Sequence, residues 1–202
     1  TLLGQNVNSY KSKNNKFHNL LEEVSKINGL KRIRYTSPHP KDMSDEVINI
    51  MNKYDNICNS VHLPLQAGSN RILKRMNRTY TKEQFISLAQ KIQNRLPNVG
   101  ISTDIIVGFP GETNSDFEQT LEVMNAVKFD FAFNFKFSAR RGTKAVEYDD
   151  QINEEDKKSR LTRVINLQKK HTLFKNEKLI GSHQQVLIEK ESKLSSFDWA
   201  GR

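Results

Sequence analysis

The 202-residue sequence contains 36% hydrophobic and 27% charged residues, which is the balance of a soluble globular protein. Lys and Arg number 32 against 23 Asp and Glu, and the formal charge of +9 favours a polyanionic partner. All apolar runs are far shorter than the roughly 20 residues that span a bilayer, so we expect no membrane segment and a cytoplasmic protein.

The start of the chain and its cysteine content limit what this sequence can do alone. The first residues lie in an apolar run without Met, so we expect a fragment of a longer protein. The single cysteine, Cys58, excludes an internal disulfide and indicates a reducing compartment. It also excludes a cluster or zinc site made only from cysteines of this chain.

Strands and helices are predicted to alternate from the first residue. In chain order we expect a strand at 1–5, a helix at 16–27, a strand at 31–37, a helix opened by Ser44, a strand at 57–65, a short helix capped by Ser69, a helix at 82–95, a strand at 99–108, a helix at 114–127, a strand at 130–139, a long helix at about 154–179 and a lone strand at 184–190. Capping-box pairs, Thr81 with Gln84 and Thr113 with Asp116, mark two helix starts. Repeated β-α units with short connections favour a parallel sheet or a (β/α) barrel.

Each expected strand has one apolar and one polar face, as in the row Phe131, Phe133, Phe135 and Phe137, which alternates with polar residues. A closed barrel fills its interior with branched apolar side chains, and a doubly wound sheet has nearly continuous apolar strands. We therefore expect a partial barrel whose apolar faces, including the phenylalanine row, pack against helices. The polar faces would line a ligand cavity, with these residues: Thr36, Ser60, His62, Ser102, Asp104, Asn134, Lys136 and Ser138.

The candidate site lies at the carboxyl ends of the strands, where such folds bind ligands. This rule selects Gln5, Asn6, Ser37, His39, His62, Gln66, Gly108, Gly111, Glu112, Ser138 and Arg140. The elbow Phe109-Pro110-Gly111-Glu112 joins a strand to a helix start, which is a common way to hold a nucleotide-like ligand, although a tight turn without a ligand has the same features. His62 can equally be a hydrogen-bonded core histidine, and Asp104 can bond neighbouring strands.

The short helix after Gln66 is predicted to have a basic face. Arg71, Lys74, Arg75 and Arg78 recur at helical spacing opposite an apolar face. A solvated face explains this pattern, and the alternative is a phosphate track beside the cavity. Lys11, Lys13, Arg140, Arg141 and Lys144 would then lie near the same rim. Few aromatic residues could stack on bases, Tyr10 and Tyr80 being the candidates.

Five segments together resemble the radical-SAM methylthiotransferases, in particular the branch that acts on tRNA. The segments are LLGQNVNSY at 2–10, YTSPHP at 35–40, HLPLQAGSNRILKRMNR at 62–78, STDIIVGFPGET at 102–113 and FSARRGTKA at 137–145. The five segments occur in the same order as in members of that family, and together they extend over nearly the whole chain. The segment from about Gly181 onward resembles the start of the TRAM domain, a small all-β module with which such enzymes grip RNA.

The resemblance implies an α/β fold: a partial (β/α) barrel of the radical-SAM type at 1–178, incomplete at its N-terminal end, and a truncated TRAM domain at 179–202. It implies S-adenosylmethionine and [4Fe–4S] clusters as cofactors, with cluster ligands outside this chain. The implied reaction adds a methylthio group to isopentenylated adenosine beside the tRNA anticodon, with an electron donor and a sulfur source as further partners. The implied cofactor-binding residues are Gln5, Asn6, Ser37, His62, Gln66, Asp104, Gly108, Gly111, Glu112 and Ser138, and the RNA-binding residues are Arg71, Lys74, Arg75, Arg78, Arg140 and Arg141.

The sequence departs from the family pattern in several places. The three-cysteine cluster motif is absent, so we expect this fragment to be inactive alone. Ala67 and Asn70 replace a usual Ser and Asp, and Arg141 and Lys144 stand where prolines are frequent. Two other hypotheses remain at this point: a non-catalytic RNA-binding scaffold, and a metal-dependent lyase on a (β/α) barrel that uses His39, His62 and Asp104. We expect a monomer.

Overall fold

The computed structural model describes residues 1–36 and 39–201, and the chain divides into two compact units, residues 1–172 and 173–202. In chain order the elements of the first unit are β1 (Lys11–Ser12), β2 (Asn15–Lys16), α1 (Phe17–Ser25), α2 (Asp45–Lys53), β3 (Ser60–His62), α3 (Asn70–Arg75), α4 (Lys82–Arg95), β4 (Gly100–Val107), α5 (Asn114–Val127) and β5 (Phe131–Lys136). Helix α6 (Glu154–Glu177) runs from the first unit into the second, which contains β6 (Ile188–Glu191) and β7 (Trp199–Gly201).

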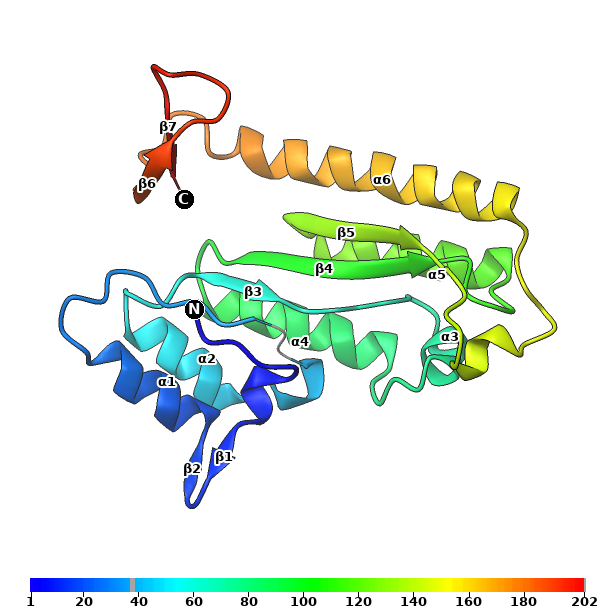
Figure 1. Ribbon diagram of the computed structural model, residues 1–202, viewed down its shortest axis with the longest axis horizontal. Helices are drawn as coiled ribbons and strands as arrows, with labels where there is room; N and C mark the ends of the chain where they lie inside the picture. The colour runs from blue at the N-terminus through cyan, green and yellow to red at the C-terminus, as the bar shows by residue number, and fades with distance from the viewer. Residues whose placement is uncertain (37–38, 202) are drawn as a thin grey trace. The chain divides into compact units, whose positions relative to one another are not determined.

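A parallel sheet in the order β3-β4-β5 forms the centre of the first unit (Figure 1). Three isolated parallel bridges continue the same strand order, joining Leu2 to Tyr35, Ile33 to Ile57 and Gln66 to Ile105. The predicted parallel β-α order is therefore confirmed. The predicted strands at 1–5 and 31–37 are wrong in length, because each is reduced to single bridges, and a short 3-10 helix already begins at Val7.

Strand β4 has one buried and one open face, as predicted. Its buried side chains are Ile101, Thr103, Ile105 and Val107, whereas Ser102, Asp104 and Ile106 are only partly covered. Helices α4 and α5 lie behind the sheet, against the buried face (Figure 1). The β-branched side chains of one face of this strand thus pack in the core, and the side chains of the other face are directed to the open side.

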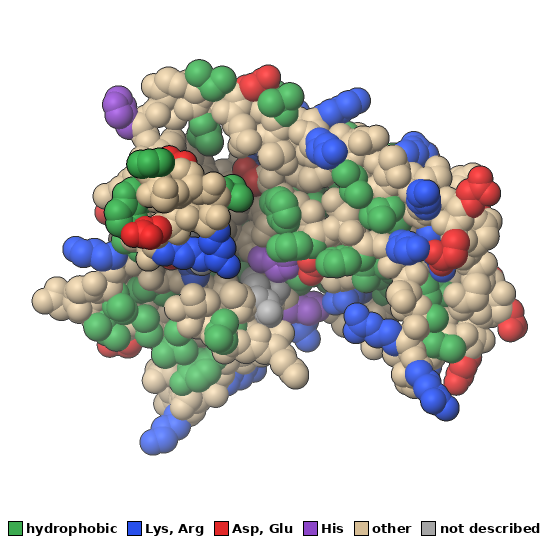
Figure 2. Space-filling model, turned by 45° about the horizontal axis from the view of Figure 1, so that its top comes forward, with side chains coloured by type: hydrophobic (Ala, Val, Ile, Leu, Met, Phe, Trp, Pro, Cys, Tyr) green, Lys and Arg blue, Asp and Glu red, His purple; other side chains and the backbone are tan. Residues whose placement is uncertain are grey.

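Strand β5 has the opposite orientation from the one predicted. Phe133 pairs with Asp104 and Phe135 with Ile106, so the phenylalanine row lies on the open face, where Phe131, Phe133 and Phe135 are each about half exposed. Figure 2 shows hydrophobic side chains gathered in the middle of this face, next to histidines. Asn134 and Lys136 alternate onto the opposite face, although Lys136, at the end of the strand, also contributes to the lining of the main cavity. The prediction that the phenylalanine row packs against helices was wrong.

Helix α6 explains the orientation of β5. The side chains that α6 buries are mostly polar: Lys157, Arg160, Val164, Gln168 and His171. Gln168 Nε2 donates a hydrogen bond to the Phe129 carbonyl at 2.8 Å, and Lys136 Nζ pairs with Glu154 at 2.6 Å. Because the face of α6 that packs here is polar, it can cover the polar side of β5. The alternation of polar and apolar residues along β5 therefore does not predict which of its two faces is open.

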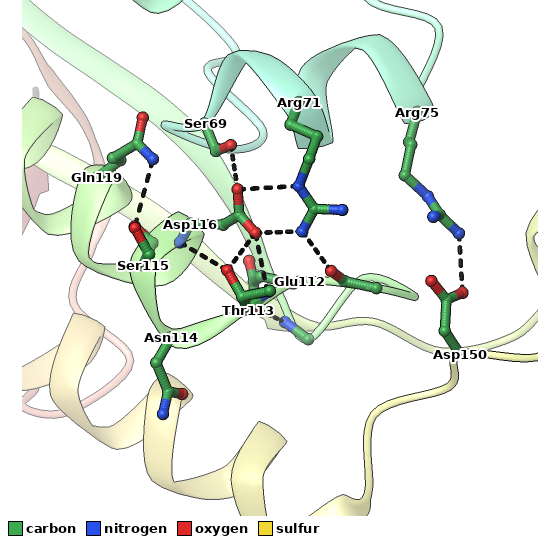
Figure 3. A network of polar contacts seen from close by, with 12 residues as sticks. Ser69, Arg71, Arg75, Glu112, Thr113, Asn114, Ser115, Asp116, Gln119 and Asp150 are labelled. Carbon is green, nitrogen blue, oxygen red and sulfur yellow. Dashed lines mark hydrogen bonds and ion pairs between the residues drawn. The ribbon is translucent and has the colours of Figure 1, made fainter.

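The carboxylate of Asp116, near the start of α5, joins this helix to α3 (Figure 3). It accepts hydrogen bonds from Ser69 Oγ at 2.5 Å and from Thr113 Oγ1 at 2.6 Å, and it pairs with the Arg71 guanidinium. Burial acts to raise the pKa of Asp116, but the hydrogen bonds from Arg71, Ser69 and Thr113 outweigh it and hold the pKa well below its usual range. The network fixes α3 and its basic residues against the elbow that precedes α5.

The predicted helix starts are confirmed with one exception. Thr81 Oγ1 accepts from the Gln84 amide, and Thr113 Oγ1 accepts from the Asp116 amide at 3.2 Å, so both capping boxes form. Ser69 was expected to cap α3, but its hydroxyl makes no capping bond because it is directed to Asp116.

The second unit contains an antiparallel pair, β6 with β7. The expected lone strand at 184–190 corresponds to β6, which lies slightly later and has a partner. Large apolar side chains of this unit are exposed, Leu194 and Phe197 almost completely. The TRAM assignment stays a prediction. No helix in the described part of the chain is long and apolar enough to cross a membrane.

We predict that Asp116→Asn destabilises the protein by about 2–3 kcal/mol at pH 7, because it removes hydrogen bonds to a charged, buried acceptor. The folded-state pKa of Asp116 is depressed, so its contribution is fully present above the unfolded-state pKa, near 4, and is lost as the pH falls through the folded-state pKa. Urea denaturation at pH 7 and at about pH 3 measures this. A stability difference that stays constant between the two pH values would contradict the assignment.

Candidate functional site

A cavity of about 960 Å³ opens at the carboxyl ends of β4 and β5. The strands contribute Asp104, Ile106 and Phe135 to its wall, and α3 contributes Lys74 and Arg75. The segment that follows β5 completes the wall with Ser138, Arg140, Thr143, Lys144, Ala145 and Tyr148. The position agrees with the rule that open α/β sheets bind ligands beyond the ends of their strands.

The cavity brings together seven of the residues predicted for the site. They are Gln66, Lys74, Arg75, Arg78, Asp104, Ser138 and Arg140. Five other predicted residues, Gln5, Asn6, Gly108, Gly111 and Glu112, lie outside the lining, as do His62, Arg71 and Arg141. Ser37 lies outside the described residues.

Gln66 is the buried end of the β3 segment and has a left-handed backbone, with φ +68°. Its amide donates to the Asp104 carbonyl at 2.8 Å, and its carbonyl accepts from the Ile106 amide at 2.8 Å. A non-glycine residue in this region of φ/ψ space is uncommon, and such residues concentrate at binding sites. The backbone bonds fix Gln66 beside the two cavity-lining residues of β4.

His62 lies on the open face of the sheet and connects to the cavity through Asp104. Its Nε2 lies 3.2 Å from Asp104 Oδ2, and its Nδ1 lies 3.0 Å from Ser102 Oγ. The ring also contacts Phe133, with 6.0 Å between ring centroids. His62 is therefore hydrogen-bonded, as the structural alternative required, but on the open face and not in the core. It is placed to orient the Asp104 carboxylate.

The glycine elbow supports the cavity from behind and contributes Phe109 to its wall. Gly108 has φ +72°, and a Cβ there would come within 2.4 Å of Lys157 Cγ on α6. Glu112 Oε2 accepts from the Gly108 amide at 2.7 Å and from Arg160 Nη1 at 2.9 Å. Burial raises the pKa of Glu112, while Gly108 and Arg160 act to lower it. These contacts give Gly108 and Glu112 a packing function.

Gly111 holds the segment after β5 close to the elbow. Its φ is +77°, and a Cβ would come within 2.4 Å of Asp150 Oδ2. Its amide donates to the Asp150 carbonyl at 2.8 Å, and Asp150 Oδ1 lies 2.8 Å from Arg75 Nη2. Arg75 in turn lies over the Tyr148 ring at 4.5 Å. The absence of a side chain at Gly111 allows this close approach.

Positive charge dominates the cavity. Lys74, Arg78, Arg140 and Lys144 line it without an ion pair to any described residue, against the single lining carboxylate of Asp104. The Nε atoms of Arg75 and Arg78 are buried donors that have no hydrogen-bond partner in the described part of the chain. Buried donors without partners are rare, so this wall suits a ligand with acceptor oxygens.

Arg71 has a different function from Lys74 and Arg78. Its guanidinium is directed to Asp116, with which it pairs, and to the Gly111 carbonyl, to which it donates (Figure 3). Arg71 does not line the cavity. The solvated-face alternative does not describe Arg71 either, because the pair holds α3 in place. Arg141 is exposed next to the cavity segment.

Asn6 belongs to a second recess, of about 580 Å³, near the N-terminus. Its Nδ2 donates to Asp42 Oδ2 at 2.7 Å, and its Oδ1 accepts from the His39 amide at 3.2 Å. Gln5 is exposed. The carboxyl-end rule did not predict that the ends of the first two β segments lead to a separate recess.

Sequence reasoning missed the aromatic wall of the cavity. Phe109 contacts Phe137 with 5.1 Å between centroids and Tyr148 with 6.3 Å. Phe135 was assigned to the wrong face, and Tyr148 is brought in by a turn that no local pattern predicts. Among the described residues, no three His, Cys, Asp or Glu side chains form a metal-binding group, so His39, His62 and Asp104 do not make the site that the lyase hypothesis requires.

Comparisons with known proteins identify the family of this chain. Residues 2–124 match the model of the Radical SAM superfamily. Relatives named tRNA-2-methylthio-N(6)-dimethylallyladenosine synthase include one from Thermodesulfovibrio yellowstonii, 51% identical over 94% of this chain and 44% of the relative, and one from Acetivibrio thermocellus, 47% identical over 100% of this chain and 43% of the relative. The chain thus spans less than half the length of these relatives.

A solved structure supports the same fold at low sequence similarity. Escherichia coli coproporphyrinogen III oxidase, described as a radical SAM enzyme, matches 76% of this chain and 36% of its own with a TM-score of 0.58 and 15% identity. The family match covers most of the sheet and its helices, including the cavity-lining residues of α3 and β4. This chain belongs to the radical SAM superfamily.

Proposed function

We propose that the full-length protein is a cytoplasmic tRNA methylthiotransferase that adds a methylthio group to dimethylallyl-adenosine (isopentenylated adenosine) beside the anticodon. The observation that carries the proposal is the common name of the relatives, which are 46–51% identical over 94–100% of this chain. The basic cavity agrees with an RNA substrate. The scaffold hypothesis is less favoured, because a scaffold has no need of a cavity of about 960 Å³ lined by aromatic rings and amides.

S-adenosylmethionine, which membership of the superfamily implies, suits the inner part of the cavity. Its volume is at the upper end of the roughly 300–1,000 Å³ typical of small-molecule sites. Phe109 and Phe135 offer surfaces for an adenine ring, and the Asp104 carboxylate and the side-chain oxygen of Gln66 offer acceptors for an amino group or a ribose hydroxyl. When bound, the cofactor supplies radical chemistry, and these residues bind and orient it.

A [4Fe–4S] cluster, the second implied cofactor, does not fit the residues of this chain. Such clusters require several cysteine thiolates, and Cys58 is the single cysteine. Its ligands would have to come from another part of the full-length protein. The electron donor, the sulfur source and a monomeric state stay predictions, as does the assignment of residues 179–202 to a TRAM domain.

The rim of the cavity is the proposed contact with the tRNA anticodon stem-loop. Lys74, Arg140 and Lys144 are exposed cations on the wall, and Arg78 adds a further positive charge to the lining. Phosphate oxygens are the acceptors that Lys and Arg bind in RNA. The inner residues would hold the cofactor while the rim holds the substrate backbone.

We predict that deleting the gene abolishes methylthiolated adenosine in cellular tRNA and leaves the dimethylallyl precursor. Mass spectrometry of tRNA nucleosides measures both species. Complementation with the wild-type gene should restore the product, whereas Asp104→Asn should restore much less, because Asp104 lines the cavity and pairs with His62. An unchanged methylthio-adenosine level in the deletion strain would refute the proposed function.

We predict that the double substitution Lys74→Gln and Arg140→Gln weakens tRNA binding by the full-length protein. Each lost phosphate contact lowers the slope of log K against log salt by about 0.7–0.9, so the slope should fall by about 1.5. Lys158→Gln with Lys169→Gln on α6 is the matched control, since both lysines are exposed and neither lines the cavity. If the cavity pair and the control pair have the same slope, the rim does not bind RNA.

A further inference from the structure

The N-terminal part of the chain carries a second basic surface that is separate from the cavity. Residues 1–21 contain no Asp or Glu but include Lys11, Lys13 and Lys16. Strands β1 and β2 form a hairpin that projects away from α1 (Figure 1), and all three lysines lie on it. Every residue from 11 to 16 is exposed, so these charges are presented to solvent and not buried against the core.

The hairpin forms one wall of the 580 Å³ recess. Lys11 and Lys16 line it from the hairpin, and Lys41 lines it from the short 3-10 helix Pro40–Asp42. Amide and hydroxyl groups of Asn6, Asn8 and Ser9 add to its polar lining, and the partly exposed Tyr10 stands beside them. Cations, neutral polar groups and one accessible aromatic ring are the combination that contacts phosphates, sugars and a base.

The acids near the recess do not neutralise these lysines. Asp42, the single carboxylate of the lining, accepts a hydrogen bond from Asn6 Nδ2 at 2.7 Å. Glu22 pairs with Lys53 and Glu23 with Lys26, each at 2.7 Å. None of Lys11, Lys13, Lys16 and Lys41 makes an ion pair with a described residue, although the charge of Lys16 contributes to lowering the pKa of Glu46. The surface therefore keeps an excess of positive charge.

Contacts of His39 link two residues of the recess lining to a chain segment close to the first cavity. The His39 amide donates to Asn6 Oδ1 and to Asn8 Oδ1, at 3.2 and 2.9 Å. Its ring contacts Tyr80, with 5.9 Å between centroids, and Tyr80 follows the cavity residue Arg78 by two positions. A polyanion long enough to reach beyond the first cavity can thus meet both basic surfaces.

We propose that the hairpin lysines and the recess beneath them bind the sugar-phosphate backbone of the RNA whose target nucleotide enters the first cavity. The proposal rests on the proposed function for the identity of that RNA. Lys11, Lys13 and Lys16 hold phosphates, and the Tyr10 ring stacks on a base or packs on a ribose. An acidic protein surface is the competing partner.

The test compares full-length variants in binding to an unmodified tRNA transcript, by fluorescence anisotropy over a salt series of about 50–200 mM. Changing Lys11, Lys13 and Lys16 together to Gln should weaken binding on the order of 10- to 100-fold and lower the salt slope by about 2–3. The same three changes to Arg should retain wild-type binding, because they keep the charge. Lys158, Lys169 and Lys170 of α6 changed together to Gln form the matched control.

Two results would overturn the inference. One is wild-type affinity and slope in the hairpin Gln variant, which would leave an acidic protein as the partner. The other is an equal loss in the α6 control, which would show that net charge alone is responsible. Methylthiolation by the wild-type protein is assayed in parallel: an active wild type with an unaffected hairpin variant refutes this inference alone, and an inactive wild type with a hairpin-dependent affinity refutes the proposed function alone.

Discussion

The alternation of side chains along β4 is the constraint on which the rest of the first unit depends. Ile101, Ile105 and Val107 lie on the face that the helices cover. Thr103 can be buried on the same face because its Oγ1 accepts a hydrogen bond from the Leu65 amide at 3.0 Å. A register shift of one residue would exchange the two faces and bury the carboxylate of Asp104. The same register that fixes the core therefore fixes which groups face the cavity.

Much of this arrangement follows from local sequence. The helix starts at Thr81 and Thr113 and the two faces of β4 depend on neighbours within a few residues, so patterns predict them well. The orientation of β5 does not, because it depends on what covers the strand. Helix α6 buries Lys157, Arg160 and Gln168, and a polar helix against a polar strand face breaks the rule that apolar faces meet helices.

The candidate site was predictable to the extent that it depends on strand ends. Gln66 and Asp104 come together because neighbouring parallel strands end at one edge. Arg71 and Arg75 lie four positions apart on α3 and have the same expected environment in the sequence. In the structure Arg71 pairs with Asp116, whereas Arg75 pairs with Asp150 and lies over the Tyr148 ring. Pairs so far apart in sequence leave no local signal.

We propose that the open face of β4 and β5 holds S-adenosylmethionine. Equilibrium dialysis of the cofactor with full-length Phe135→Ser tests it most directly, with Phe131→Ser as a control on the same strand and face but outside the cavity lining. Losing a phenyl ring from a contact surface is worth about 1.5–3 kcal/mol, so Phe135→Ser should bind at least about tenfold more weakly while Phe131→Ser binds as the wild type does. Equal affinity of the two variants would contradict the claim.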